Sequence, residues 1–164
     1  MNDDGIEEKV IDAFAGVASS LGYSDLHGRI LGYLFLSEKP VPLQEIAGKL
    51  NYSLSTISLS IDFLEALGTI KKSKKGADRK VYVLLQSDLL DCLRKAVLLK
   101  AEKAINVSLN DLMQESAKIK GAKTEKAKKA LHTIKVLETE IKRLQSFLSL
   151  VKEFKLPKAN QRKV

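Results

Sequence analysis

The sequence predicts a mainly α-helical protein with one small β-hairpin and long helices at its C-terminal end. Three observations support this fold class. Two short amphipathic patterns follow one another over residues 43–67, two strand-like runs flank a basic turn over residues 69–85, and apolar residues recur at heptad spacing over residues 127–151. The 164 residues are therefore expected to divide into an N-terminal helix at 1–23, a central domain at 24–86, long helices at 87–156 and a disordered tail at 157–164.

The first two helices are indicated by their capping signals. Asp4 followed by Glu7 has the spacing of a capping box, and apolar residues then recur every three or four positions until Gly22. Ser24 can cap a second helix. Because residues 1–40 carry a net charge of −4, we expect the first helix to stay off nucleic acid and to serve packing or dimerisation.

A helix-turn-helix pattern follows a connection bounded by Pro40 and Pro42. Its first helix has apolar residues at i, i+3, i+4 and i+7 and ends at Asn51, and its second begins at Ser53, whose hydroxyl can accept a backbone N–H. Gly68 ends the second helix. The residues expected in its buried stripe are Leu54, Ile57, Ile61 and Leu64. The residues expected on its opposite face are Ser55, Leu59 and Asp62, flanked by Thr56 and Phe63.

A basic hairpin is predicted directly after this helix. Thr69–Ser73 and Lys80–Leu85 read as strands around a turn that contains Gly76 and Asp78. From residue 71 to residue 80 there are six basic residues and one acidic residue, a local charge of +5. The basic residues are Lys71, Lys72, Lys74, Lys75, Arg79 and Lys80. A hairpin tip this basic suits a wing that lies on DNA phosphates or reaches the minor groove.

Two long helices complete the chain. Ser87 or Asp88 can cap the first, which extends to about Ile119, and Gly121 separates it from the second. The second helix, from Ala122 to about residue 155, would be roughly 50 Å long, more than a small domain covers by itself. Its heptad seam predicts a partner chain. The seam residues expected to mediate dimerisation are Ile134, Leu137, Ile141, Leu144, Leu148 and Val151.

Composition limits the function. The net charge is +8, of which residues 91–164 carry +10, either as a solvated lysine face or as a contribution to DNA binding. Cys92 is the single cysteine, which suits packing better than a redox switch between subunits. His27 and His132 have no further ligand-type residue at helical spacing, so no metal site is expected. We also expect no cofactor and no enzymatic activity, because no phosphate-binding loop and no nucleophile motif is present.

No apolar run approaches the ~20 residues that span a bilayer. The acidic start of the chain is unlike a secretory signal. We therefore expect a cytoplasmic protein without a membrane segment.

The stretch GRILGYLFLSEKPVPLQEIAGKLNYSLSTIS, then FLEALG, then DRKVY, resembles the GbsR-type branch of the MarR superfamily of winged helix-turn-helix transcriptional regulators. The resemblance covers about residues 28–83. It implies a homodimer, a recognition helix at Ser53–Leu67 and a wing arginine at Arg79. It also implies a cytoplasmic repressor or activator, with control by osmolytes in some members. The small-molecule effector, if one binds, is left unidentified by the sequence.

Double-stranded DNA is thus the expected partner. The recognition-helix residues expected to contact it are Ser53, Ser55, Thr56, Ser58 and Leu59. These side chains include no Arg, Asn or Gln, which make the strongest base contacts. Phosphate contacts are expected from the wing lysines and a minor-groove contact from Arg79. The alternative is a winged-helix module that joins a protein assembly, for which Leu59, Asp62 and Phe63 give some support.

Overall fold

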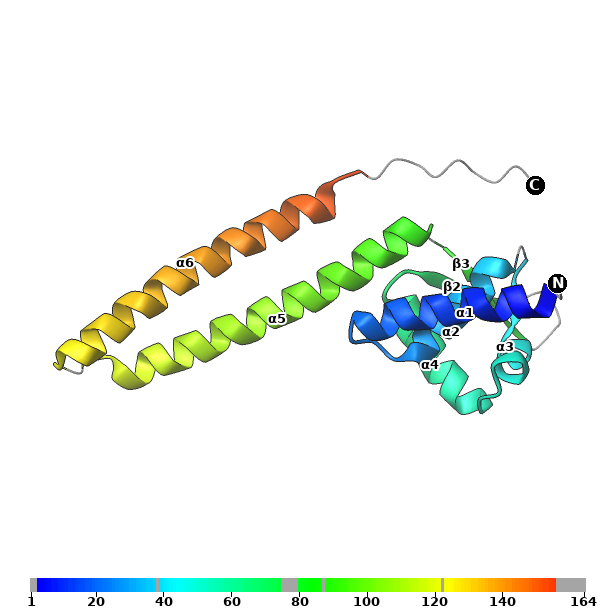
Figure 1. The fold of residues 1–164 in the computed structure, drawn as a ribbon, viewed down its shortest axis with the longest axis horizontal. Helices are drawn as coiled ribbons and strands as arrows, with labels where there is room; N and C mark the ends of the chain where they lie inside the picture. Colours follow the sequence, from blue (N-terminus) through cyan, green and yellow to red (C-terminus); the bar gives the residue numbers. More distant parts are fainter. Residues whose placement is uncertain (1–2, 38, 75–79, 87, 122, 156–164) are drawn as a thin grey trace. The chain divides into compact units, whose positions relative to one another are not determined.

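The computed structural model describes residues 3–37, 39–74, 80–86, 88–121 and 123–155 (Figure 1). The chain divides into two compact units, Met1–Ala96 and Val97–Val164. The elements are α1 (Asp3–Ser20), α2 (Asp25–Leu36), β1 (Val41–Pro42), α3 (Leu43–Leu50), α4 (Leu54–Ala66), β2 (Ile70–Lys74), β3 (Val81–Leu85), α5 (Leu89–Ile119) and α6 (Glu125–Glu153). Arg79 and Lys75 of the expected wing, and the expected tail at 157–164, lie outside the described residues.

Helices α1 and α2 pack closely because two glycines of α2 face α1. A Cβ atom at Gly28 would lie 2.3 Å from the carbonyl oxygen of Phe14, and one at Gly32 would lie 3.0 Å from the Cα atom of Ile11. Any larger residue at Gly28 would therefore push the two backbones apart. An ion pair between Arg29 and Asp12, at 2.9 Å, lies across the same two helices.

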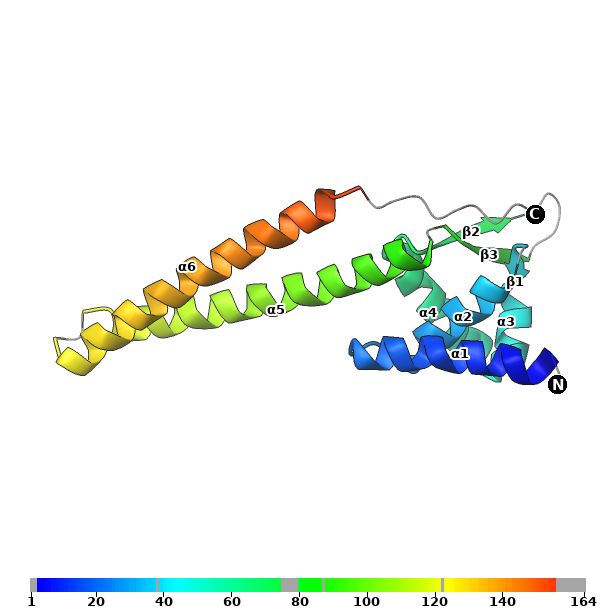
Figure 2. The ribbon, with the colours of Figure 1, turned by 45° about the horizontal axis from the view of Figure 1, so that its top comes forward.

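The sheet has three antiparallel strands in the order β1-β3-β2, where the sequence predicted only the β2–β3 hairpin (Figure 2). The additional strand β1 places Val41 opposite Val83 and Pro42 opposite Tyr82. Pro42 is tolerated because β1 is an edge strand. Two residues are too few to produce the alternation by which a strand is recognised in a sequence.

The core of the first unit joins α2, α3, α4 and the sheet. Its fully buried apolar side chains include Ile30, Ile46, Ile57, Ile61, Ile70 and Val83. The prediction that Leu54 belongs to the buried stripe is wrong, because its side chain is 47% exposed. Leu54 is the first residue of α4, and it precedes by one turn the buried part of the stripe, which starts at Ile57.

The second unit is an antiparallel helical hairpin formed by α5 beyond Val97 and by α6, which lie side by side in Figures 1 and 2. Gly121 has a φ of +95°, and the Thr124 hydroxyl accepts a hydrogen bond from the backbone N–H of Ala127 at 3.2 Å. Contacts between the helices include a hydrogen bond from Gln145 to Asn106 at 3.2 Å. No residue of α6 is buried, so the hairpin leaves its apolar seam partly in solvent.

None of the helices in the described ranges combines the length and the apolar character needed to cross a bilayer.

Candidate nucleic-acid interface

The first turn of α4 is organised by its N-cap. Ser53 has extended backbone angles, and its hydroxyl accepts a hydrogen bond from the backbone N–H of Thr56 at 3.1 Å. The two hydroxyl oxygens, of Ser53 and Thr56, are 2.8 Å apart and share a second hydrogen bond. Both side chains remain exposed. The cap thus fixes the start of the helix and still leaves hydroxyl groups at its surface.

The outer face of α4 is polar apart from one large side chain. Ser55 is exposed and Ser58 is half-buried, whereas Leu59 is 72% exposed. Ile57 and Ile61 on the opposite face are completely buried and hold the helix against the core. An exposed leucine on a firmly packed helix is available for apolar contact, for example with a thymine methyl group in a major groove.

The prediction that Phe63 flanks this outer face is wrong. Its ring stacks on the ring of His27, with centroids 4.6 Å apart and an interplanar angle of 21°, and lies 6.0 Å from the ring of Tyr23. The packed side of α4 is therefore wider than the predicted stripe, because α2 also covers the part of α4 that carries Phe63. The pattern of one helix could not reveal this second neighbour.

The wing presents two of its lysines to solvent along β2. Lys71 and Lys74 are exposed, and Lys74 lies opposite Val81 in the register of the hairpin. Lys80, directly before β3, is exposed as well. The strands place these three ammonium groups on a hairpin that follows the end of α4 after a short turn.

The ammonium group of Lys72 is paired within the protein. Its ammonium nitrogen lies 2.6 Å from a carboxylate oxygen of Asp62 and 2.8 Å from one of Glu65, and its backbone N–H donates to Glu65 at 3.0 Å. Hydrogen bonds with Asp62 and Glu65 raise the pKa of Lys72, and the hydrogen bonds from Lys72 lower the pKa of Glu65. This α4–β2 ion-pair cluster neutralises carboxylates of α4 and ties the wing to it.

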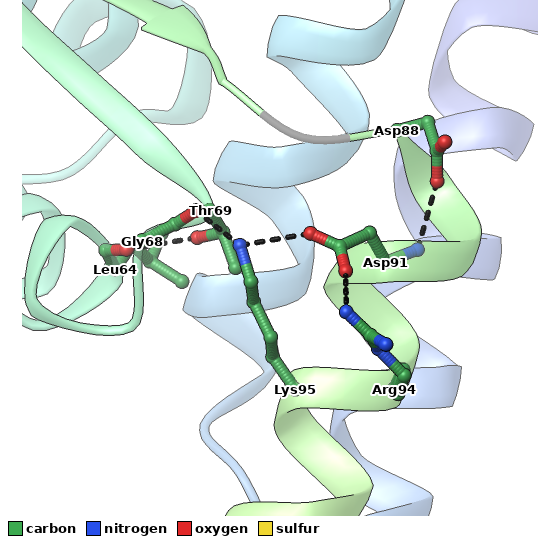
Figure 3. A network of polar contacts seen from close by, with 7 residues as sticks. All are labelled: Leu64, Gly68, Thr69, Asp88, Asp91, Arg94 and Lys95. Atoms are coloured by element: carbon green, nitrogen blue, oxygen red, sulfur yellow. Dashed lines mark hydrogen bonds and ion pairs between the residues drawn. The ribbon is translucent and has the colours of Figure 1, made fainter. Parts of the chain in front are cut away.

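A second set of polar contacts joins the end of α4 to the start of α5 (Figure 3). Gly68 has a φ of +65°, and the buried hydroxyl of Thr69 donates to the carbonyl oxygen of Leu64 at 2.9 Å. The ammonium group of Lys95 donates to the carbonyl oxygen of Gly68 at 2.7 Å and lies 2.8 Å from a carboxylate oxygen of Asp91. These contacts satisfy carbonyl groups at the C-terminal end of α4 and fix its orientation.

A small apolar cavity of about 80 Å³ lies between α1, α2, α4 and the first turns of α5. Phe14, Phe35 and Leu31 contribute to its wall. His27 also lines it, and the Nδ1 atom of that residue is buried without a hydrogen-bond partner among the described residues. Burial lowers the pKa of His27. Its burial thus disfavours the charged form of the imidazole.

Cys92 lines the same cavity and is buried. Burial raises the pKa of its thiol to about 11. A protonated, buried thiol is a poor nucleophile, which favours packing over the redox switch that the sequence left open. Among the described residues no cluster of three His, Cys, Asp or Glu side chains is placed to hold a metal ion.

A helix with an exposed outer face that follows a helix and turn, and is itself followed by a β-hairpin, defines a winged helix-turn-helix domain. The structure is similar to the crystal structure of a transcriptional regulator, with a TM-score of 0.59 and 17% sequence identity over 90% of this chain and 99% of that chain. The predicted fold class, mainly α-helical with a small β-hairpin wing and long C-terminal helices, is confirmed.

Two further solved structures align more loosely. One is a transcriptional regulator from Thermotoga maritima, with a TM-score of 0.42 and 22% identity over 83% of this chain and 89% of that chain. The other is a mutant of MepR from S. aureus bound to an oligodeoxyribonucleotide, with a TM-score of 0.43 and 16% identity over 88% of this chain and 91% of that chain. No protein-family model and no curated protein matches the sequence.

Proposed function

We propose that the chain is a transcriptional regulator that binds double-stranded DNA as a homodimer, and that it is a repressor of the GbsR-type branch of the MarR superfamily. The observation that carries the proposal is the exposed outer face of α4, directly followed by a hairpin with exposed lysines. Together with the likeness in fold to a transcriptional regulator, this supports α4 as the recognition helix in the major groove and β2–β3 as the wing.

Most of the binding free energy is assigned to the wing. Hydroxyl groups and Leu59 make weaker base contacts than the bidentate contacts of Arg, Asn or Gln, each worth roughly 1–3 kcal/mol. Lysines on phosphates release counterions whatever the DNA sequence. Lys72 is paired with Asp62 and Glu65. The phosphate contacts are assigned to the exposed Lys71, Lys74 and Lys80, and to Lys75. Arg79 is assigned to the minor groove.

The dimer is assigned to the second unit. Leu137 and Leu144 are 45% and 47% exposed in the single chain, and Ile134, Ile141, Leu148 and Val151 are half-buried. A partner chain would cover this seam, as in a coiled coil. Two-fold symmetry then places the recognition helices in successive major grooves, so the operator is an inverted repeat with half-sites about 34 Å apart.

An electrophoretic mobility shift with the full chain and genomic fragments tests this proposal. We expect one fragment with an inverted repeat to stay bound in excess random DNA, and Leu59→Asp to abolish that preference. Ala66→Asp, an exposed position at the other end of α4, is the control with the same added charge. Absence of any retarded fragment at low salt would contradict DNA binding.

The alternative is a protein-interaction module, which the exposed apolar side chains near the start of α4 favour. Tyr52 is 38% exposed and Leu54 is 47% exposed, and they precede Leu59 by seven and five residues. If this surface binds protein, Leu59→Ala would weaken that complex and leave DNA affinity unchanged. Substitutions at Leu59 therefore separate the two functions.

The cavity beneath α4 is the proposed site of a small effector. Its volume of about 80 Å³ is below the 300–1,000 Å³ typical of drug-sized ligands, so only a small, mostly apolar molecule fits without rearrangement. Ala18→Leu, which adds side-chain volume at the wall, should abolish any effect of such a molecule on operator binding. Small quaternary ammonium compounds and small phenols are the probes, and DNA affinity is the readout.

A further inference from the structure

The positive charge of the second unit is concentrated at the closed end of the α5–α6 hairpin. Residues 118–135 contain seven lysines and one acidic residue, a net charge of +6. Residues 97–117 contain two basic and three acidic residues, and residues 136–155 contain four and three, so their net charges are −1 and +1. The basic tip is defined by Lys118, Lys120, Lys123, Lys126, Lys128, Lys129 and Lys135.

Most of the basic tip is exposed and has no acidic partner. Lys118 pairs with Glu115 at 2.5 Å and Lys128 pairs with Glu125 at 2.8 Å. The other five lysines are exposed, and none forms an ion pair within the described residues. Surfaces that serve only solubility normally intersperse charges of both signs. Seven lysines beside one another repel each other, and this repulsion would be relieved by a polyanion.

Three of the four tip lysines in α6 also share one side of the helix, whereas Lys126 lies closer to the seam. At about 100° per residue, Lys128, Lys129 and Lys135 point away from the seam residues Ala127, Ala130 and Ile134. His132 lies among them and is exposed. The apolar seam and these three lysines are therefore on different sides of α6, and a partner chain on the seam leaves the three lysines accessible.

The chemistry of the surface favours phosphate over a bilayer or a protein. No large apolar side chain is exposed between Met113 and Val136 in the described part of the hairpin, whereas membrane-bound helices insert such side chains beside their lysines. Protein interfaces are depleted of lysine and enriched in aromatic residues and Arg. Exposed lysines without apolar neighbours match the phosphates of a nucleic acid.

We propose that the basic tip binds the phosphate backbone of double-stranded DNA, as a second contact in addition to α4 and the wing. This contact rests on the proposed function and extends it. The unit assigned to dimerisation would add affinity for DNA that does not depend on the DNA sequence. The contact also accounts for the separation of charge within α6, which dimerisation through the seam does not require.

The test replaces Lys126, Lys129 and Lys135 together with Gln in the full chain. The matched control is Lys103→Gln, Lys142→Gln and Lys155→Gln, three exposed lysines outside the tip with the same loss of charge. Fluorescence anisotropy with a duplex about four helical turns long and without an operator is measured over a range of salt concentrations, and circular dichroism verifies folding. We expect the slope of log K against log[salt] to become shallower by about 2 to 3, since each lost phosphate contact contributes about 0.9.

A slope equal to that of the control variant would overturn the inference, and so would retention on anionic vesicles without binding to the duplex. The result is separable from the proposed function. If the mobility shift finds no preferred fragment but the salt slope still depends on the tip lysines, the function assigned to α4 is contradicted and the tip contact is supported. If a preferred fragment is found but the slope does not depend on the tip lysines, only the tip contact is contradicted.

Discussion

The two units of the molecule bury their apolar residues to very different extents. In the first unit, side chains from α2, α3, α4 and the sheet form a core in which several residues, among them Ile57 and Ile61, are completely inaccessible. In the described part of the second unit only Leu98 and Ile105 are buried, and α6 has no buried residue. The geometry proposed to read DNA is thus fixed within one chain, whereas the seam of α6 is left uncovered within the single chain and is assigned to the proposed dimer.

The largest effect is expected at the seam. Leu144→Lys would place an unpaired charge in the proposed dimer interface, so we expect a monomeric or unfolded chain in analytical ultracentrifugation. The control is Ser146→Lys, an exposed position away from the seam, which should leave the dimer intact. A folded, dimeric Leu144→Lys variant would contradict the assignment of this helix.

The next effect sharpens the contrast between buried and exposed positions of α4. Ile61→Ala removes a side chain that is 0% exposed and should lower the free energy of unfolding by roughly 2–5 kcal/mol. Leu54→Ala, at a residue that is 47% exposed, should cost no more than about 1 kcal/mol. Urea denaturation of both variants measures the difference. Equal losses would mean that the helix packs in another orientation.

A smaller effect is expected where α1 meets α2. Gly28→Ala would place a Cβ atom 2.3 Å from the carbonyl oxygen of Phe14, and the resulting shift should cost about 1–3 kcal/mol. Gly16→Ala is the matched control, because nothing lies within 4 Å of the added atom. Alanine there should be stabilising by roughly 0.5–1 kcal/mol. Thermal melts of the two variants should therefore shift in opposite directions.

The smallest effect is expected in β2, where Lys71 and Lys72 should respond differently to substitution. Lys71→Ala should make the salt slope of DNA binding shallower by about 1, whereas Lys72→Ala should leave the slope unchanged, since its ammonium group is paired with Asp62 and Glu65. Surface ion pairs contribute about 0–1 kcal/mol to stability, so Lys72→Ala should destabilise only slightly. Anisotropy titrations and urea melts measure the two quantities.

The same cluster predicts a pH dependence. Lys72 lowers the pKa of the Glu65 carboxyl group in the folded state. The ion pair between the two residues therefore stabilises the fold above the ordinary carboxyl pKa, and this stabilisation is lost as the pH falls through the lowered pKa of Glu65. Lys72→Ala should remove this part of the acid sensitivity.

Local signals in the sequence were sufficient for the helices and the β2–β3 hairpin of the winged domain. Ser24 and Ser53 cap the helices they were predicted to cap, and Asn51 and Gly68 have the positive φ angles expected at helix ends. These features depend on neighbouring residues alone. Strand β1 was missed because its two residues are defined only by their pairing with β3.

Tertiary neighbours explain the remaining differences. Phe63 was placed on the outer face of α4, but helix α2 packs against it. Lys72 was grouped with the other wing lysines because the pairing with Asp62 and Glu65 joins different elements. The acidic residues of α4 near a lysine-rich strand were the available signal for that pairing. The DNA-contact residues themselves stay a prediction.

The central claim is that the wing supplies most of the DNA affinity and α4 a modest sequence preference. The measurement is the salt dependence of binding for the double variant Lys74→Ala and Lys75→Ala, on an operator and on a scrambled duplex, with Lys9→Ala and Lys103→Ala as the control of equal charge. We expect the slope of log K against log[salt] to become shallower by about 1 to 2, with nearly equal losses on both duplexes. An unchanged slope would show that the wing does not lie on the DNA backbone and would favour the protein-interaction module.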